Sequence, residues 1–276
     1  MEYKDQYQQP QTPKYECLLF DLDDTLYPPS SGLSEQCSEI IKEYMVQKLG
    51  IEESKVPEMN RVLYQNYGTT LAGLKAIGYN FDNDDFHSFL HGRLPYDKLK
   101  PDHVLRTLLL SLPIRKVIFS NAEEVHVAKG LSKLGLEDCF DQIICFETLN
   151  PNNDNTVNDN IIEVPSQSDA HDSGLPKSPI VCKPFENAFE EAFKKANINP
   201  QRTLFFDDSI RNIQTGKLMG LDTVLVGSSH RANGVDYALE SIHNIREALP
   251  MLWEVKEESG SIGYQEKMGI ETPVEA

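Results

Sequence analysis

Short apolar runs alternate with longer amphipathic stretches along most of the chain. A continuous apolar run of about 4–8 residues is typical of a strand that is buried on both faces of a parallel sheet. Such runs lie at about 15–20, 116–119, 142–146, 203–206 and 222–226. Apolar positions at helical spacing lie at about 101–111, 123–134, 185–196, 209–219 and 243–252. The alternation predicts an α/β fold with a parallel sheet and helices on both of its faces.

Residues 33–92 interrupt this alternation, because their apolar positions recur at helical spacing and show little strand pattern. Ser34 is the expected N-cap of the first helix. A glycine followed by an apolar residue commonly ends a helix. Such pairs occur at Gly50–Ile51, Gly78–Tyr79, Gly135–Leu136 and Gly220–Leu221. We therefore expect a small α-helical domain, residues 28–100, inserted into the α/β unit.

Three polar segments lie outside these patterns. Residues 1–14 are rich in Gln, Pro and Tyr and predict a disordered N-terminal tail, and residues 254–276 predict an acidic C-terminal tail. Asn, Asp, Ser and Pro dominate residues 150–179, which predicts a disordered insert. A second folded domain is the alternative there, although so polar a segment would bury little core. The α/β core is then expected to comprise 15–27 and 101–253.

The net charge of the chain argues against some classes of function. The chain has 276 residues, with 26 Lys and Arg against 43 Asp and Glu, and a net charge of −17. No basic cluster offsets this charge, which argues against a protein that binds nucleic acid or a membrane surface. An acidic protein that handles a phosphate ester needs a local cation or local basic side chains, so the charge points to a metal.

The cysteines and the hydropathy of the chain indicate where in the cell the protein is located. The five cysteines are an odd number without a CxxC pair, which indicates reduced thiols and predicts a cytoplasmic location, with entry into the nucleus left open. The first 15 residues lack the apolar centre of a signal peptide. No apolar run reaches the roughly 18 residues of a transmembrane helix. We expect no association with membranes.

Acidic residues stand directly after two of the apolar runs. Asp21 and Asp23 follow the first run, and Asp207 and Asp208 follow the run at 203–206. An acidic turn is the ordinary interpretation of either pair alone. Two parallel strands, however, bring their carboxyl ends to one edge, where open α/β sheets bind ligands. Clustered carboxylates repel one another unless a cation compensates them, and oxygen ligands suit Mg²⁺. The two pairs therefore predict a shared magnesium site.

Other candidate residues are less specific on their own. Ser120 and Asn121 follow another apolar run, where a serine is often no more than a helix N-cap. Lys183 stands before a predicted helix, where a lysine usually lies on the surface. His87 and His91 are four residues apart, a helical spacing that can bind zinc. No third ligand is near them in the sequence, so we interpret them as a surface or core pair.

Taken together, four motifs in order resemble the haloacid dehalogenase superfamily. They are DLDDT at 21–25, FSN at 119–121, KP at 183–184 and FFDDS at 205–209. Each motif alone is common, whereas the ordered set is highly specific, and the resemblance spans roughly 15–250. It implies a Rossmann-like core, and it implies that the helical insertion at 28–100 is a cap that closes over the site.

The resemblance implies a catalytic role for three residues. Asp21 would be the nucleophile, which attacks phosphorus to form an aspartyl-phosphate. Asp23 would be the general acid for the leaving oxygen and then the base that activates water. Lys183 would neutralise charge on the nucleophile and on the transferring phosphoryl group. Because the dehalogenase branch lacks a carboxylate at the position of Asp23, the resemblance favours phosphoryl transfer.

The resemblance also implies binding roles. Thr25 would support the phosphate-site loop, and the Ser120 hydroxyl and the Asn121 backbone N–H would bind phosphoryl oxygens. The Mg²⁺ ligands would be Asp21, the Asp23 carbonyl, Asp208 and, less directly, Asp207.

Within the superfamily, the chain most resembles the pyrimidine 5′-nucleotidase branch of yeast and plants, whose members act on UMP and CMP. The features that carry this are DLDDTLYP at 21–28, YGTTLAGL at 67–74 and FFDDSIRNI at 205–213. Gly68, Thr69 and Thr70 are expected either to contact a base or sugar or to form a turn between helices with a threonine cap.

The sequence therefore predicts a Mg²⁺-dependent phosphoric monoester hydrolase for a small phosphomonoester, a pyrimidine nucleoside 5′-monophosphate such as UMP or CMP. A phosphatase for a sugar phosphate or pyridoxal phosphate shares every catalytic residue. A phosphomutase uses the same acid pair but needs a bisphosphate activator. A regulatory protein on an inactive phosphatase fold is the alternative from another class, and the sequence names no protein partner.

Overall fold

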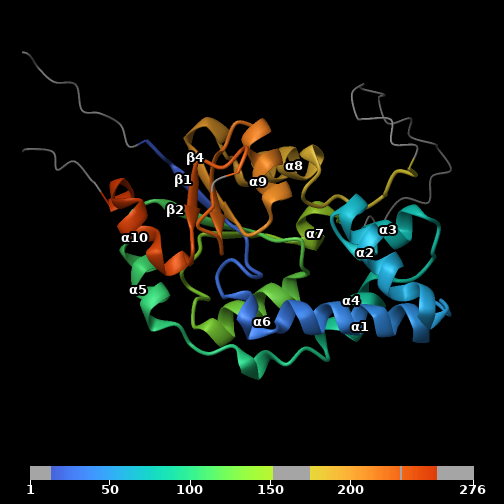
Figure 1. Cartoon of the computed structure of the whole chain (residues 1–276). Helices are drawn as coiled ribbons and strands as arrows, with labels where there is room; N and C mark the ends of the chain where they lie inside the picture. Colours follow the sequence, from blue (N-terminus) through green and yellow to red (C-terminus); the bar gives the residue numbers. More distant parts are fainter. Residues whose placement is uncertain (1–13, 152–174, 231, 254–276) are drawn as a thin grey trace, which may run out of the picture.

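The computed structural model describes residues 14–151, 175–230 and 232–253. In these residues, six strands form one parallel sheet in the order β3-β2-β1-β4-β5-β6 (Figure 1). The strands are β1 (Cys17–Phe20), β2 (Arg115–Phe119), β3 (Gln142–Ile144), β4 (Thr203–Asp207), β5 (Asp222–Val226) and β6 (Tyr237–Leu239). The central strand β1 has β2 on one side and β4 on the other, so the ends of these three strands lie together.

Successive residues of β1 and β4 enter two separate apolar cores, as expected for strands that are buried on both faces. Phe20 and Phe206 stack with their ring centroids 4.5 Å apart in one core. Leu19 and Phe205 lie in the other. The first core is covered by α5 (His103–Ser111), α6 (Glu124–Leu134) and α10 (Ile245–Ala248), and the second by α8 (Glu186–Ala196) and α9 (Ile210–Leu218). Figure 1 shows α5 and α10 on the opposite side of the sheet from α8 and α9. The predicted Rossmann-like α/β fold is confirmed.

Four helices between β1 and β2 form the inserted α-helical domain, or cap, at the right of Figure 1. They are α1 (Leu33–Gln47), α2 (Val56–Tyr67), α3 (Thr70–Ala76) and α4 (Asn83–His91). Tyr44 of α1 packs edge-on against Phe86 of α4, with ring centroids 4.9 Å apart. These apolar residues belong to the same cluster as Leu18 and Phe20 of the sheet, so the cap packs continuously onto the core. The boundaries at 28 and 100 stay predictions.

The predicted glycine endings are present in the structure. Gly135 has φ 68°, and the N–H of Leu136 donates back to the Leu131 carbonyl at 2.8 Å. Gly78 has φ 96° and is followed by the same type of bond. A side chain at such a φ would be strained, which explains why glycine marks these ends.

Several local predictions are wrong in detail. Gly32, not Ser34, precedes α1 as its N-cap. The helix predicted at about 185–196 begins one residue later, because Phe185 is the N-cap of α8. The strand predicted at 142–146 ends at Ile144, and α7 (Phe146–Leu149) follows it. Each of these boundaries differs from the prediction by only one or two residues.

Two differences concern the end of the described chain. The sequence did not indicate β6, because three residues carry little pattern and this edge strand depends on pairing with β5. The helix predicted at 243–252 is broken at Leu249–Pro250, since a residue before proline is disfavoured in a helix. Short 3₁₀ turns occur at Pro29–Ser31, Glu53–Lys55, Tyr96–Lys98, Pro200–Arg202, Ile242–Asn244 and Pro250–Trp253.

Most of the predicted tail at 1–14, most of the insert at 150–179 and the tail at 254–276 lie outside the described residues. Among the helices that the structure describes, none is long and apolar enough to cross a membrane. All five cysteines lie in the described ranges and are free thiols, four of them buried.

Candidate active site

The side chains that follow β1 and β4 meet at a buried lysine. Phe20 pairs with Phe206 in the sheet register, so Asp21 and Asp207 emerge next to each other. Lys183 Nζ lies 2.9 Å from Asp21 Oδ1 and 2.8 Å from Asp207 Oδ2. The Lys183 residue is only 1% exposed. The lysine predicted from one of the four motifs is therefore an internal counter-charge for two carboxylates.

Asn121 fixes the position of Lys183. The Asn121 side-chain oxygen accepts a hydrogen bond from the Lys183 backbone N–H at 2.8 Å, and its amide donates to the Lys183 carbonyl at 3.0 Å. Asn121 follows β2, next to β1, and this places it opposite the loop before α8. The sequence suggested a role for the Asn121 backbone and gave no signal for this side-chain clamp.

Both carboxylate oxygens of Asp207 accept hydrogen bonds. Asn212 Nδ2 donates to both of its oxygens at 3.0 and 3.1 Å, and the Ser209 N–H donates to Oδ1 at 2.9 Å. Asp208, in contrast, is exposed towards the cavity described below. Asp21, Asp207 and Asp208 each offer an oxygen within 4.8 Å of the others. Such a set of carboxylate oxygens fits a hard divalent cation.

Charge at the strand ends also fits a cation. Burial, together with Asp207 and Asp208, raises the pKa of Asp21 well above its usual range, although Lys183 opposes this. Burial and the charges of Asp207 and Asp24 raise the pKa of Asp208 to about 7. Burial alone would lower the pKa of Lys183, but its two carboxylate partners outweigh burial and raise it. Negative charge therefore exceeds what one lysine compensates, and a divalent cation would restore the balance.

Ser120 and Thr25 are the predicted phosphate-site residues. The Ser120 oxygen accepts a bond from the Ala122 N–H at 3.0 Å, and Ser120 lines the cavity. Because this bond uses the oxygen as an acceptor, the Ser120 hydroxyl proton can be donated to a ligand oxygen. The Thr25 hydroxyl is buried and has no hydrogen-bond partner among the described residues.

Asp23 makes contacts that the sequence did not predict. His126 Nε2 of α6 lies 2.7 Å from Asp23 Oδ1, and the Tyr27 hydroxyl donates to the same oxygen. His126 Nδ1 in turn lies 2.8 Å from the Tyr96 hydroxyl. Burial would raise the pKa of Asp23, but the charge and hydrogen bond of His126 and the Tyr27 hydroxyl lower it to about 2. Burial opposes protonation of His126, yet Asp23 outweighs this and raises its pKa.

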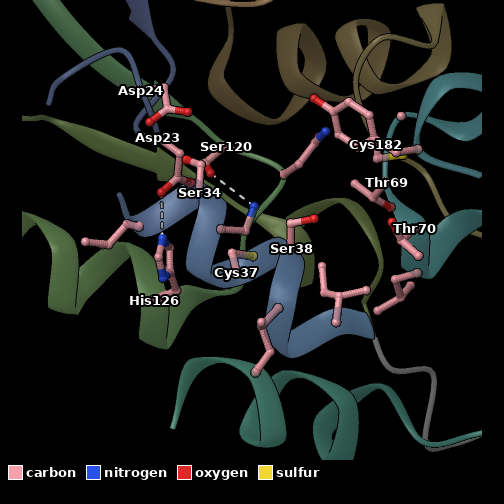
Figure 2. A pocket seen from close by; sticks show the side chains of 18 of the residues that line it. Asp23, Asp24, Ser34, Cys37, Ser38, Thr69, Thr70, Ser120, His126 and Cys182 are labelled. Atoms are coloured by element: carbon pink, nitrogen blue, oxygen red, sulfur yellow. Dashed lines mark hydrogen bonds and ion pairs between the residues drawn. The ribbon is translucent and has the colours of Figure 1, made fainter. Parts of the chain in front are cut away.

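A cavity of about 550 Å³ lies between these residues and the cap. Figure 2 shows Asp23, Ser120 and His126 on one side of it and Thr69, Thr70 and Cys182 on the other. The cavity is lined by core residues including Asp21, Asp23, Ser120, Asn121, Lys183 and Asp208, and by cap residues including Ser34, Ser38, Asn60, Tyr64, Thr69 and Thr70. Most of the predicted site residues, though not Thr25 or Asp207, therefore face the same cavity as the cap.

The loop between α2 and α3 approaches the core closely. The Thr69 side chain accepts a bond from the Ala72 N–H at 3.1 Å, so the threonine-capped turn is present. A Cβ on Gly68 would lie 2.1 Å from the Lys183 carbonyl oxygen and 2.8 Å from Pro184 Cδ. Contact of this loop with a base or sugar stays a prediction.

Replacing Gly68 by Ala is expected to displace the loop or the Lys183 peptide, lowering stability by about 2 kcal/mol or more and lowering activity. Gly50→Ala is the matched control, because Gly50 also has positive φ but a Cβ there would meet nothing within 4 Å. Urea unfolding and steady-state rates check this. Equal destabilisation by the two variants would show that the close approach at Gly68 is unimportant.

Comparison with known proteins agrees with this architecture. The family model of haloacid dehalogenase-like hydrolases matches residues 15–220. Phosphate metabolism protein 8 of Saccharomyces cerevisiae is 24% identical over 239 residues, which cover 83% of this chain and 66% of that protein. The chain thus spans just under two thirds of the length of this curated relative.

Two solved structures share the fold. CbbY from Rhodobacter sphaeroides in complex with phosphate has a TM-score of 0.54 and 16% identity, covering 86% of this chain and 99% of that chain. A HAD phosphatase from Thermococcus onnurineus has a TM-score of 0.53 and 16% identity, covering 84% and 96%. At this identity the likeness concerns the fold alone.

Proposed function

The chain belongs to the haloacid dehalogenase-like hydrolases, and on that basis we propose that it is a Mg²⁺-dependent phosphatase for a small phosphomonoester. The observation that carries the proposal is the buried Lys183, which lies between Asp21 and Asp207 at the strand ends that border the cavity. The phosphatase from Thermococcus onnurineus and the phosphate-bound CbbY have the same fold, which is consistent with the proposal.

In the proposed reaction, an Asp21 oxygen attacks phosphorus, and the bond from phosphorus to the leaving oxygen breaks. Asp23 gives a proton to that oxygen, then removes one from the water that hydrolyses the aspartyl-phosphate. The second step releases phosphate and restores Asp21. Lys183 and the Ser120 hydroxyl offset negative charge on the phosphoryl oxygens.

Proton supply to Asp23 involves its neighbours in this proposal. The contacts with Tyr27 and His126 hold Asp23 as a carboxylate, the form that accepts a proton from water. To act first as an acid, Asp23 must take up a proton, and His126 Nε2 at 2.7 Å is an adjacent proton carrier.

Asp21, Asp208 and the Asp23 carbonyl would hold Mg²⁺, with Asp207 contributing less because its oxygens already accept several hydrogen bonds. The bound cation would supply positive charge against the carboxylates and the phosphoryl oxygens.

The substrate we infer is a pyrimidine nucleoside 5′-monophosphate. The cavity volume lies within the range of about 300–1,000 Å³ for sites that enclose small molecules. On its cap side, Asn60 Nδ2 donates to the Ser38 hydroxyl at 3.2 Å, and Asn60 Oδ1 accepts from Thr70 at 2.6 Å. These amide and hydroxyl groups make the cap side of the cavity polar, which matches the polar edges of a pyrimidine base and a ribose.

Phosphate release from a panel of phosphomonoesters tests both levels of the proposal. With Mg²⁺ we expect selective turnover of UMP and CMP, and chelation by EDTA should abolish it until Mg²⁺ is added back. Turnover of sugar phosphates or pyridoxal phosphate instead would support the proposed phosphatase reaction but contradict the proposed nucleotide substrate. A requirement for a bisphosphate activator would indicate a mutase, and no release from any ester would favour a binding protein.

A further inference from the structure

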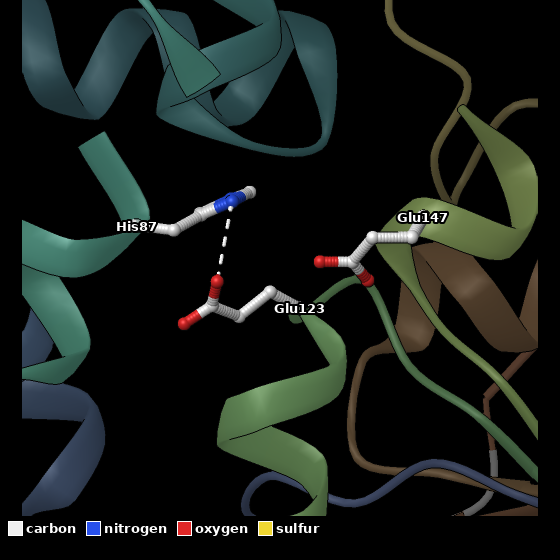
Figure 3. A group of neighbouring side chains, drawn as sticks. All are labelled: His87, Glu123 and Glu147. Atoms are coloured by element: carbon white, nitrogen blue, oxygen red, sulfur yellow. Dashed lines mark ion pairs between the residues drawn. The ribbon is translucent and has the colours of Figure 1, made fainter. Parts of the chain in front are cut away.

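A second cluster of possible metal ligands lies where the cap meets the core. It contains His87 of α4, Glu123, which is the N-cap residue of α6, and Glu147 of α7. One ligand atom of each residue lies within 4.8 Å of the other two. Figure 3 shows the His87 ring above Glu123, with the Glu147 carboxylate turned towards both. None of the three belongs to the acidic set at the strand ends.

The His87 imidazole is buried and incompletely satisfied. Its side chain is 7% exposed, and within the described residues Nδ1 has no hydrogen-bond partner. Nδ1 lies 3.7 Å from Glu123 Oε2, too far for a hydrogen bond. Two ligands that each lie about 2.0–2.2 Å from zinc are roughly 3.4 Å apart in a tetrahedral site. The observed separation is therefore close to that of two ligands of one cation.

Both carboxylates are held in place by neighbours. Glu123 Oε1 contacts His91 Nδ1 at 2.5 Å, and its other oxygen lies on the side of His87. Glu147 Oε2 accepts from the Glu124 N–H at 2.9 Å and from the Cys145 thiol at 3.2 Å. Supporting contacts of this kind orient the ligands of protein metal sites.

The surroundings of the cluster also suit a cation. Glu123 is buried and Glu147 is half-buried, so both carboxylates are partly withdrawn from water. The Phe146 ring packs edge-on against the His87 ring, with ring centroids 4.6 Å apart. A divalent cation between the His87 nitrogen and the two carboxylates would supply positive charge at this position.

We propose that His87, Glu123 and Glu147 bind a second divalent ion, a transition metal such as zinc. One imidazole nitrogen and two carboxylate oxygens suit zinc better than Mg²⁺, which takes oxygen ligands. Because His87 belongs to the cap and the two glutamates to the core, the bound metal ties α4 to the start of α6 and to α7. The site thus fastens the cap beside the cavity.

Zinc binding by the 276-residue chain tests the site, with saturating Mg²⁺ present to occupy the strand-end acids. Equilibrium dialysis with metal analysis is expected to show one tightly held zinc, and zinc should raise Tm. His87→Gln should weaken zinc binding by at least about 100-fold. His103→Gln, which changes an exposed histidine at the start of α5, is the matched control and should bind zinc like the wild type.

Glu147→Gln is the second variant. Because Glu147 is only half-buried, this substitution tests the site even if the His87→Gln protein does not fold. It should also lose the zinc. Cobalt in place of zinc should give visible absorption without a thiolate charge-transfer band, and Cys145→Ser should leave it unchanged. Equal zinc binding by His87→Gln and wild type, or a thiolate band, would overturn the site. Zinc binding is measured without any phosphatase assay. The test of this site therefore does not depend on whether the proposed phosphatase activity is found.

Discussion

Asp21→Asn is expected to lower the rate of phosphate release by at least about 10⁴-fold, because it removes the atom proposed to attack phosphorus. The substitution keeps the size of the side chain and can still accept a bond from Lys183 Nζ. Steady-state release of phosphate measures the loss. Rapid quenching after mixing with labelled substrate should trap an acyl phosphate on the wild type and none on the variant.

The control for Asp21→Asn is Asp102→Asn. Asp102 caps α5 through a bond from the Leu105 N–H at 2.8 Å, and asparagine caps a helix equally well. This variant should keep wild-type turnover. If Asp21→Asn keeps more than a small fraction of wild-type turnover, or still accumulates the acyl phosphate, the proposed nucleophile is wrong.

Lys183→Met is expected to lower the free energy of unfolding by about 3–5 kcal/mol and to remove activity. Methionine fills similar space without charge, so Asp21 and Asp207 are left buried without their counter-charge. Breaking a buried ion pair in this way costs more than the pair itself contributes, because the remaining charges stay desolvated. Urea unfolding followed by circular dichroism, with EDTA present, measures the change.

Two further variants make this prediction specific. Adding Asp207→Asn to Lys183→Met removes one of the two buried carboxylates that have lost their counter-charge. The free energy of unfolding should then recover by about 1 kcal/mol or more, which a double-mutant cycle measures. Lys194→Met changes an exposed lysine of α8 that pairs loosely with Glu191 at 3.7 Å, and should stay within about 0.5 kcal/mol of wild type. A similar small effect for Lys183→Met would contradict the role of Lys183 as the internal counter-charge.

The sequence by itself determined the features that depend on neighbours along the chain. Continuous apolar runs predicted β1 and β4, because a strand covered on both faces needs apolar residues at every position. Gly78 and Gly135 marked helix ends, because their backbone conformation strains other residues. The acids after β1 and β4 were expected to meet, since parallel strands end at one edge and Phe20 pairs with Phe206.

Only the tertiary structure decided which distant side chains complete these sites. Asn121 clamps Lys183 across 62 positions, and His126 reaches Asp23 across 103. His87 had no third ligand near it in the sequence, yet the packing of α4 against the core brings Glu123 and Glu147 to it. Such contacts follow from the order of strands in the sheet and from how the cap docks, and they leave no periodic pattern in the sequence. Local patterns therefore determine the elements and the acids at their ends, whereas the partners of those acids are set by packing between elements.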